Sequence, residues 1–424
     1  MTYSAYVVKI EKLRKHTNAD RLMIATVFGN DVIVGKDVKV GDVMVYFPTD
    51  GRLGLEFAEK NNLLRKKDKD GKNTGGYLDP KKRHIRAIKL RGEESDGLLT
   101  SLDSLSHFCD INELKVGDKI NVLNGVLICE KYIPERNNRT KTHSNNKKKQ
   151  NKANEFPHFQ EHVSTPQLAY NKNKFREGDW CTITLKLHGT SGRTGYVQRD
   201  KGGNFIKRFL SKIGVKFKND YEYVSGTRRV VLDKFDGGYY GNNEFREKWH
   251  NFFKGKLKKG ETVYYEIVGY VDEDTTIMPK CNNKKMKDED FLEKYGDTTT
   301  FTYGCERGEN DIYVYRMTMT GEDGHVIEYP TWLTQYRCEQ MGVKHVPVLD
   351  TFKFTSIEDL DSRIDKFGDG ADPIGKTHIR EGVCVRIENR WNFSIFKHKN
   401  FPFKVLEGII KDDGILDIEE EQNL

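Results

Sequence analysis

The stretch "WCTITLKLHGTSGRTGYV", residues 180–197, decides how the second half of this chain is interpreted. It opens with a run of apolar and β-branched residues that predicts a strand, and the run ends at Lys186. Gly189 and Thr190 then suit a tight turn, where backbone can approach phosphate closely. Taken alone, such a short pattern occurs by chance, so Lys186 by itself is better interpreted as an exposed lysine.

Four downstream segments change that interpretation, because they follow in order and each forms or precedes a strand-like run. They are "ETVYYEIVGY" with Glu266, "DIYVYRMTM" with Tyr315, "REGVCVRIEN" with Glu381, and "FSIFKHKNFPFK" with Lys397 and Lys399. The two lysines are two residues apart in a strand, so we expect them on the same face. Together these residue types fit one reaction, the attack of a lysine amine on the α-phosphorus of a nucleotide.

The main physical difficulty of that reaction lies at the nucleophile. A lysine with a reference pKa of about 10.4 is neutral only about one time in a thousand near pH 7.5, which withholds roughly 4 kcal/mol from the amine. We expect repulsion from Lys397, Lys399 and a bound divalent cation to make Lys186 less basic.

The ordered set "KLHGT", "YYEIVG", "YVY", "EGV" and "KHK" resembles nucleotidyltransferase motifs I, III, IIIa, IV and V. These motifs belong to the covalent nucleotidyltransferase superfamily of DNA ligases, RNA ligases and mRNA capping enzymes. Here they span residues 186–404. The histidine in the first motif is most similar to the RNA ligase 2 branch, since most DNA ligases and capping enzymes carry aspartate there. The resemblance implies an α+β nucleotidyltransferase domain of antiparallel sheets with flanking helices.

The resemblance also implies how the chain would bind ATP. Lys186 would form the lysyl-AMP adduct, with His188 acting in the same loop after adenylylation and Gly189 beside the nucleotide. Glu266 would hydrogen-bond the adenosine ribose, and Tyr315 would stack on adenine.

The remaining motif residues would handle phosphate, metal and the RNA end. By the resemblance, Glu381 would hold Mg²⁺ or Mn²⁺ through water, and Lys397 and Lys399 would contact the α-phosphate. Arg228, in "YVSGTRRVVL", falls where the motif Ia arginine meets the acceptor 5′-phosphate. Because Arg229 is adjacent, the sequence leaves open which of the two arginines has that role.

Residues 3–132 form a different region, made of short Val-, Ile- and Tyr-rich runs separated by Gly, Asp and Asn. This pattern predicts a small barrel or sandwich. "KHTNADRLMIATV" and "KLRGEESDGLL" resemble the tRNA-binding OB-fold modules of aminoacyl-tRNA synthetases. An OB domain before an RNA ligase core is similar to the Deinococcus- and Naegleria-type RNA ligases. We therefore expect a multidomain chain, an all-β OB-fold barrel followed by the α+β domain.

Composition sets the expected boundaries of these parts. The stretch "RNNRTKTHSNNKKKQNKAN", residues 136–154, is basic and almost without apolar residues, so it cannot bury a core. The expected domains are thus 1–133 for the OB fold, 134–155 for a basic flexible linker, 156–410 for the ligase domain and 411–424 for an acidic tail. The basic run "KKRHIRAIKLR", residues 81–91, is interpreted equally well as an RNA contact or as a charged edge strand.

The overall composition favours an intracellular protein. No run of 18 apolar residues occurs, and the seven cysteines contain no C-x-x-C pair, which argues against a membrane span, a disulfide framework and a zinc site. We expect a cytoplasmic monomer, and the Asn- and Lys-rich linker would suit a phage or virus genome rich in AT.

The function predicted from these features is ATP-dependent RNA ligation. The enzyme would self-adenylylate on Lys186, transfer AMP to an RNA 5′-phosphate and seal it to a 3′-OH, as in repair of nicked or broken RNA. One alternative is a DNA ligase or capping enzyme, although only 20 residues follow Lys404, too few for the OB domain that follows motif V in those enzymes. The other is an inactive RNA-binding protein, although every motif lysine and glutamate is present.

Overall fold

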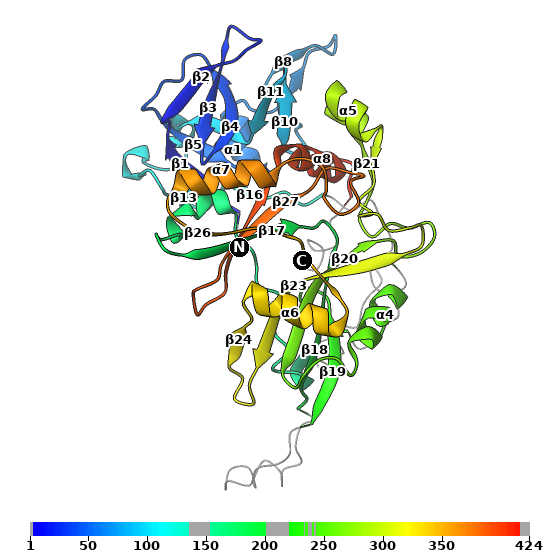
Figure 1. The fold of residues 1–424 in the computed structure, drawn as a ribbon. Coiled ribbons are helices and arrows are strands. Elements are labelled where there is room, and N and C mark those ends of the chain that lie inside the picture. The colour runs from blue at the N-terminus through cyan, green and yellow to red at the C-terminus, as the bar shows by residue number, and fades with distance from the viewer. Residues whose placement is uncertain are drawn as a thin grey trace. The chain divides into compact units, whose positions relative to one another are not determined.

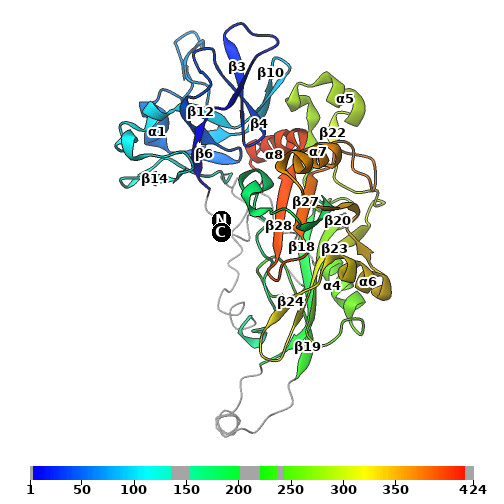
Figure 2. The same ribbon diagram turned by 60° about the vertical axis from the view of Figure 1, so that its left-hand side comes forward.

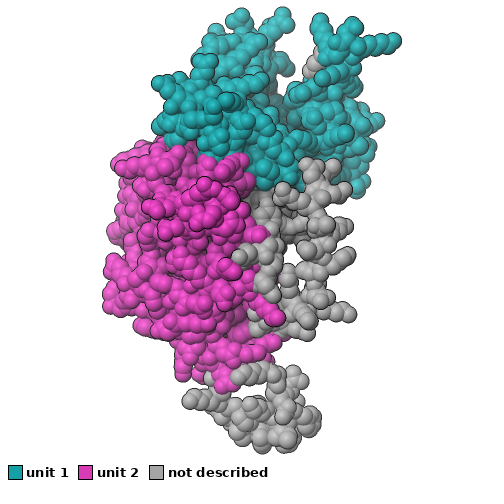
Figure 3. Space-filling model, turned by 90° about the vertical axis from the view of Figure 1, so that its right-hand side faces the viewer, with its two compact units in different colours: residues 1–137, 281–299, 399–416 teal, residues 138–280, 300–398, 417–424 magenta. Residues whose placement is uncertain are grey.

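The computed structural model describes residues 3–134, 153–200, 220–232, 234–235, 240 and 243–415 (Figure 1). Most of the predicted linker and of the acidic tail lie outside these residues. So does the segment 203–217, whose apolar residues recur at three- and four-residue spacing, a pattern that predicts a helix. The chain divides into two compact units (Figure 3). Unit 1 comprises residues 1–137, 281–299 and 399–416, and unit 2 comprises residues 138–280, 300–398 and 417–424.

Unit 1 is built from short antiparallel strands. Its sheets have the strand orders β12-β5-β1-β13, β2-β3-β4 and β16-β6-β9, with two-stranded pairs around them. Its strands are β1 Ala5–Lys9, β2 Lys12–Lys15, β3 Leu22–Val27, β4 Asn30–Gly35, β5 Val43–Phe47, β6 Gly51–Leu53, β7 Lys66–Lys67, β8 Asn73–Gly75, β9 His84–Ile85, β10 Ala87–Leu90, β11 Glu93–Asp96, β12 Leu98–Ser101, β13 Lys119–Ile120, β14 Val122–Leu123, β15 Val126–Leu127, β16 Cys129–Lys131, β21 Cys281–Asn282 and β22 Thr298–Thr299. Its α-helices are α1 Leu55–Lys60, α5 Glu289–Tyr295 and α8 Phe401–Asp412.

The core of the strand region of unit 1 is aromatic at its centre. Helix α1 places Phe57 inside, where its ring lies 5.4 Å from that of Phe47 and 5.8 Å from that of Phe108. All three residues are at most 4% exposed. Burial of such rings supplies several kcal/mol and explains why these short strands close around one core.

Several side chains of the basic run 81–91 form ion pairs within unit 1. His84 Nδ1 lies 2.9 Å from Asp412 Oδ1, and Arg86 Nη1 lies 2.7 Å from Asp412 Oδ2 in α8. Lys89 Nζ lies 2.7 Å from Asp288 Oδ2, the N-cap residue of α5. These residues therefore fasten α5 and α8 to the strands of unit 1, a role that neither interpretation of the run included.

The carboxylate of Asp412 is the centre of this attachment. Burial opposes its ionisation, but the hydrogen bond with His84 and the charges of His84 and Arg86 outweigh burial and lower the pKa of Asp412. Its neighbour Asp413 also forms an ion pair, with Lys285, but both of those side chains are more than a third exposed. The two adjacent aspartates thus offer a buried pair and an exposed pair for comparison.

We expect Asp412→Ala to destabilise the attachment of α8 by about 1–3 kcal/mol, because it leaves the buried His84 ring without its carboxylate partner. Asp413→Ala should change stability by at most about 0.5 kcal/mol, because its ion pair is exposed. Amide hydrogen exchange in α8 and β10 measures both effects. Equal protection in the two variants would contradict the role given to Asp412.

Unit 2 contains two antiparallel sheets, which differ in size. The smaller has the order β26-β17-β27-β28, and the larger has the order β19-β18-β20-β23-β24, with β25 pairing in parallel with β23. Its strands are β17 Trp180–Lys186, β18 Thr190–Gln198, β19 Tyr221–Gly226, β20 Glu261–Gly269, β23 Asn310–Thr320, β24 Val326–Glu328, β25 Lys344–His345, β26 Val348–Lys353, β27 Gly382–Ile387 and β28 Ser394–Lys399, the last residue of which is counted with unit 1. Among its described residues are the α-helices α4 Glu244–Phe253, α6 Thr331–Met341 and α7 Ile357–Gly368.

Helix α7 covers the smaller sheet of unit 2, and the larger sheet has a fully buried central strand. Helix α7 packs on the smaller sheet through Leu360 and Ile364, next to Val383 and Val385 of β27 (Figure 2). Strand β20 of the larger sheet is buried at all nine positions, as expected of a central strand. In the segments 356–368 and 242–257 apolar residues recur at three- and four-residue spacing, which is typical of helices, and these segments form α7 and α4.

A buried ion pair fastens α6 to the larger sheet. Arg337 in α6 donates through Nη2 and Nε to the two carboxylate oxygens of Glu261 in β20, at 2.8 and 2.9 Å. Tyr329 Oη donates to the same carboxylate at 3.1 Å. Such a pair is favourable inside a protein only when its remaining hydrogen-bonding groups are satisfied, as they are here for Glu261. None of the described helices is long and apolar enough to cross a membrane.

Candidate active site

The turn after Lys186 carries the chain from one sheet of unit 2 to the other. Strand β17 ends at Lys186 in the smaller sheet, and β18 begins at Thr190 in the larger one. At Gly189 the crossing is tight, since a Cβ atom there would lie 2.3 Å from the carbonyl oxygen of Ile267. The amide of Gly189 donates to Glu266 Oε1 at 3.1 Å. Only glycine fits this position, which explains the glycine of the motif.

Strand pairing brings Glu381 to the predicted nucleophile. Lys186 is opposite Gly382 in the β17–β27 ladder, so the preceding residue, Glu381, lies beside its side chain. Lys186 Nζ donates to Glu381 Oε2 at 2.7 Å, and the glutamate side chain is only 2% exposed. The partner at hydrogen-bond distance is thus a carboxylate, which stabilises the ammonium form, whereas the sequence led us to expect cations there.

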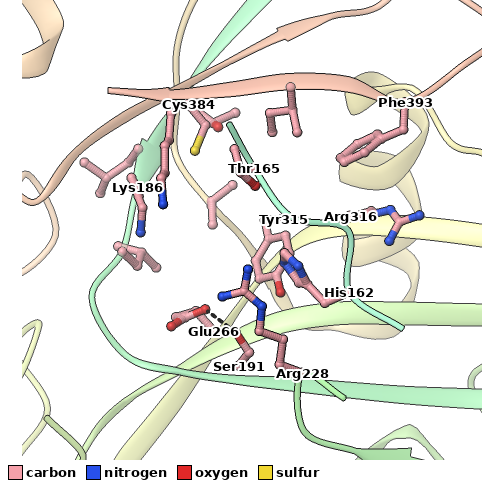
Figure 4. Close-up of a pocket in the computed structure, with 16 residues that line it drawn as sticks. His162, Thr165, Lys186, Ser191, Arg228, Glu266, Tyr315, Arg316, Cys384 and Phe393 are labelled. Atoms are coloured by element: carbon pink, nitrogen blue, oxygen red, sulfur yellow. Dashed lines mark hydrogen bonds between the residues drawn. The ribbon is translucent and has the colours of Figure 1, made fainter. Parts of the chain in front are cut away.

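A pocket lies between the two sheets of unit 2 and encloses about 770 Å³ of empty space, part of it open to solvent. The close-up shows Lys186 and Glu266 at one end, Phe393 and Arg316 at the other and Tyr315 between them (Figure 4). The pocket is lined by His162, Thr165, Thr184, Leu185, Lys186, Leu187, Ser191, Arg228, Glu266, Tyr315, Arg316, Val346, Cys384, Phe393, Ile395 and Lys397.

A β-bulge places Tyr315 in this pocket. In the β20–β23 ladder Tyr264 is opposite Arg316 and Tyr265 is opposite Val314, so Tyr315 is the extra residue. A bulge breaks the alternation of side chains and changes the direction of the inserted one. The Tyr315 ring meets the ring of His162 edge-on, with centroids 5.4 Å apart.

The structure separates the paired basic residues that the sequence left together. Arg228 is half-buried and lines the pocket, whereas Arg229 is exposed and outside the lining. Lys397 lines the pocket, but Lys399 does not, because its ammonium pairs with Glu407 of α8 at 2.8 Å within unit 1. The phosphate contacts of Lys397 and Lys399 stay predictions.

His188 lies in the turn between Lys186 and Thr190, the nucleophile turn, and is outside the set of pocket-lining residues. Its side chain is buried, and its ring packs edge-on against Phe301 with centroids 4.7 Å apart. Its backbone amide donates to the hydroxyl of Tyr303 at 2.6 Å. The predicted catalytic role of His188 after adenylylation is untested by this arrangement.

Sequence reasoning missed a segment that crosses the pocket, residues 156–167. It contributes His162 and Thr165 to the lining, and Lys397 of β28 donates its backbone amide to Pro166. At the other end, Arg193 Nη1 donates to the carbonyl oxygens of Phe159 and Gln160. Burial lowers the pKa of Arg193 to about 10, which leaves it charged at neutral pH. No motif marks this segment, because its position depends on a buried arginine from another strand.

Arg316, also missed, lies at the far end of the pocket. Glu328 of β24 accepts from its Nε at 3.0 Å, and its guanidinium lies over the rings of Tyr264 and Phe393 at 4.4 and 4.7 Å. Its charge is thus paired and its planar faces are covered. Arg316 closes this end of the pocket and supports Phe393.

Cys384 is the thiol of the pocket and is unsuited to act as a nucleophile. Burial raises the pKa of Cys384 to about 11, so the group is neutral at physiological pH. No three His, Cys, Asp or Glu side chains converge as metal ligands within the residues that the structure describes. Glu381 nevertheless suits Mg²⁺ or Mn²⁺ that is bound mainly by substrate phosphates and water, with one carboxylate.

Comparison with known proteins agrees with this architecture. A family model described as an OB-fold domain matches residues 4–102, and no curated protein matches the chain by sequence. The Naegleria gruberi RNA ligase is similar in three solved forms. A mutant with AMP and Mn is 18% identical and covers 94% of this chain and 97% of its own, with a TM-score of 0.59. A mutant with ATP and Mn is 16% identical and covers 94% of this chain and 98% of its own, with a TM-score of 0.58. The form with PPi is 18% identical and covers 93% of this chain and 96% of its own, with a TM-score of 0.59.

These matches confirm the predicted fold class, an N-terminal OB fold followed by an α+β region of antiparallel sheets and helices. The chain shares the fold of the Naegleria gruberi RNA ligase over 94% of its length. At identities of 16–18% the likeness establishes the fold, and the activity has to be argued from the site.

One contribution to the pH dependence of unit 2 comes from His345, a half-buried histidine that precedes the pocket-lining Val346. Burial lowers the pKa of His345 to about 4, against about 6.5 in an unfolded chain. Between these values the unfolded chain binds more protons, so stability falls as the pH decreases through this window. We expect His345 to account for a loss of about 2 kcal/mol between pH 7 and 5, which His345→Gln removes. Burial also lowers the pKa of His250, to about 4, and that of His378, so the part of the loss due to these two residues remains in the variant. The exposed His325→Gln is the control and should keep the loss.

Tryptophan fluorescence during urea unfolding measures this loss, because all four tryptophans lie in unit 2. If the variant at 345 lost as much stability on acidification as the wild type, the histidine would not be the cause.

Proposed function

We propose that this chain is an ATP-dependent RNA ligase with Lys186 as its nucleophile. The observation that carries the proposal is the Lys186–Glu381 ion pair beside a pocket that is lined by Glu266, Tyr315 and Lys397. An amine, two carboxylates, an aromatic ring and a further cation are the groups that a lysine-to-nucleotide transfer requires. The ligase-type fold of the chain agrees with this chemistry.

In the first step the Lys186 amine attacks the α-phosphorus of ATP. A nitrogen–phosphorus bond forms, and the bond to the leaving pyrophosphate breaks. The ion pair with Glu381 must open beforehand and the ammonium must lose a proton, because only the neutral amine has a lone pair. Lys397 is the cation of the pocket suited to the charge that develops on the phosphate.

The other pocket residues would hold the nucleoside in place during this step. Glu266, itself positioned by the amide of Gly189, accepts hydrogen bonds from the ribose. Tyr315 offers its ring to the base at the bulge in β23. Glu381 would hold a divalent ion through water, and such an ion would neutralise phosphate charge when bound.

The second and third steps use the same pocket. A 5′-phosphate oxygen of RNA attacks the phosphorus of lysyl-AMP, which releases the Lys186 amine and forms a 5′–5′ pyrophosphate linkage. The RNA 3′-OH then attacks the 5′-phosphate, a phosphodiester bond forms and AMP leaves. Arg228 is the pocket residue suited to the acceptor phosphate, because a guanidinium binds phosphate through two parallel hydrogen bonds.

Incubation with α-labelled ATP and Mg²⁺ or Mn²⁺ should give a labelled protein that survives denaturation. Lys186→Ala should abolish the label, because it removes the attacking nitrogen. Lys344→Ala, which removes an exposed lysine paired with Asp311, is the control and should label like the wild type. A wild type without label, or a Lys186→Ala protein that labels equally, would exclude covalent nucleotidyl transfer through this residue and favour an inactive RNA-binding protein.

We further expect the enzyme to seal a nick with ribonucleotides on the 3′-OH side faster than an all-DNA nick of the same sequence. Gel separation of the sealed strands under single-turnover conditions measures both rates. Faster sealing of the all-DNA nick would support a DNA ligase. Label transfer from GTP in preference to ATP, without sealing, would support a capping enzyme.

A further inference from the structure

Tyr303 forms a hydrogen bond with the nucleophile turn. Its hydroxyl accepts a hydrogen bond from the amide of His188 at 2.6 Å, and the residue is 4% exposed. Burial raises the pKa of Tyr303 well above its usual value, so the hydroxyl remains neutral. The bond is made between Lys186 and Gly189, where the chain crosses from one sheet to the other.

The backbone of Tyr303 is held in an unfavourable conformation. Its φ is +54°, in the left-handed region that bulky side chains seldom adopt, and Gly304 follows with a φ of +80°. A Cβ atom on Gly375 would lie 2.4 Å from the nitrogen of Gly304 and 2.6 Å from the carbonyl carbon of Tyr303. The loop that precedes Glu381 is therefore in close backbone contact with Tyr303. Such strain persists only where the surrounding structure imposes it.

Aromatic contacts join the same two loops. The Tyr303 ring meets His378 edge-on at 4.6 Å, and His378 meets Phe301 at 5.2 Å. Phe301 in turn contacts the ring of His188 at 4.7 Å. His378 lies three residues before Glu381, and His188 lies two residues after Lys186. Tyr303 thus belongs to a cluster of rings that connects the segment after Lys186 with the segment before Glu381.

We propose that Tyr303 is a positioning residue for lysine adenylylation. By accepting a hydrogen bond from the amide of His188, Tyr303 fixes the turn that aligns Lys186 with the α-phosphorus of the nucleotide. Tyr303 is outside the set of residues that line the pocket, so it acts through the turn and not on the substrate. This inference rests on the function proposed above.

The role predicts which step of ligation depends on Tyr303. Formation of lysyl-AMP requires the Lys186 amine as nucleophile, so it is sensitive to the alignment of the turn. Sealing of RNA that already carries a 5′–5′ AMP cap does not use that nucleophile. A misplacement of about 1 Å at a reacting group costs up to about 100-fold in rate. Loss of the hydroxyl should therefore slow the first step and spare the last.

The experiment compares Tyr303→Phe with Tyr265→Phe in the full-length protein. Tyr265 is equally buried, and its hydroxyl bonds Thr194 Oγ1 at 3.0 Å, away from the nucleophile turn. Three quantities are measured: the single-turnover rate of lysyl-AMP formation at saturating ATP, the KM for ATP, and the sealing rate of pre-adenylylated RNA. We expect Tyr303→Phe to lower the first by about 10- to 100-fold and to change the other two by less than about threefold. Tyr265→Phe should stay within about threefold of the wild type in all three.

A graded variant covers the possibility that Tyr303→Phe does not fold. With 4-aminophenylalanine at position 303, the ring keeps a weaker acceptor in the same place, so adenylylation should be slower than in the wild type and faster than in Tyr303→Phe. Tryptophan fluorescence checks that unit 2 is folded in each protein.

Two results would overturn the positioning role. One is adenylylation at the wild-type rate in Tyr303→Phe and in the aminophenylalanine protein. The other is an equal loss in adenylylation and in sealing of pre-adenylylated RNA, which would mean that Tyr303 only supports the fold. A wild type that never forms lysyl-AMP would instead contradict the proposed function, and this outcome is distinct from both.

Discussion

The site depends on a single geometric constraint, which is that the chain passes between two sheets in three residues after Lys186. The passage is narrow enough that a Cβ atom at Gly189 would collide with the backbone of the neighbouring strand. Because β17 and β18 belong to different sheets, their meeting point brings the other strands of both sheets together around one pocket. Glu266 reaches the turn from the larger sheet and Glu381 from the smaller one. Carboxylates from both sheets thus hold the segment that contains the lysine.

Many charged side chains of this protein hold elements of one unit together, so they are not available to bind a ligand. The basic run 81–91, which resembles an RNA-binding surface in the sequence, has His84, Arg86 and Lys89 engaged with aspartates inside unit 1. In unit 2, Arg193 and Arg316 are buried, and they hold a crossing segment and an aromatic ring. A count of positive residues therefore overstates the surface available to a nucleic acid. The cations that line the pocket, Lys186, Arg228 and Lys397 among them, are those best suited to phosphate.

Much of the site was predictable because its residues lie on strands with strong local patterns. Glu266 sits in an apolar and aromatic run that predicts a strand, but taken by itself its side chain could have faced solvent, and packing buries the whole strand. Tyr315 was predicted for the right strand, but its direction depends on a bulge, which is set by the pairing of β20 with β23. His162 and Tyr303 had no signal, because their segments are irregular and are placed by contacts with distant residues. Lys399 followed the strand rule and still differs from Lys397, since its ammonium pairs with Glu407 instead of lining the pocket.

The sequence alone predicted the class of fold, the strands that contain Lys186, Glu266 and Lys397, and a strand directly after Glu381. Period, residue type and motif order are local properties of a chain, so they are readable without coordinates. Only the tertiary structure decided that Lys186 pairs with a carboxylate, that the His188 ring packs against Phe301 and that Tyr303 accepts a hydrogen bond from the turn. Each of these depends on which residues far apart in sequence come within a few ångströms, and that is set by sheet pairing and packing.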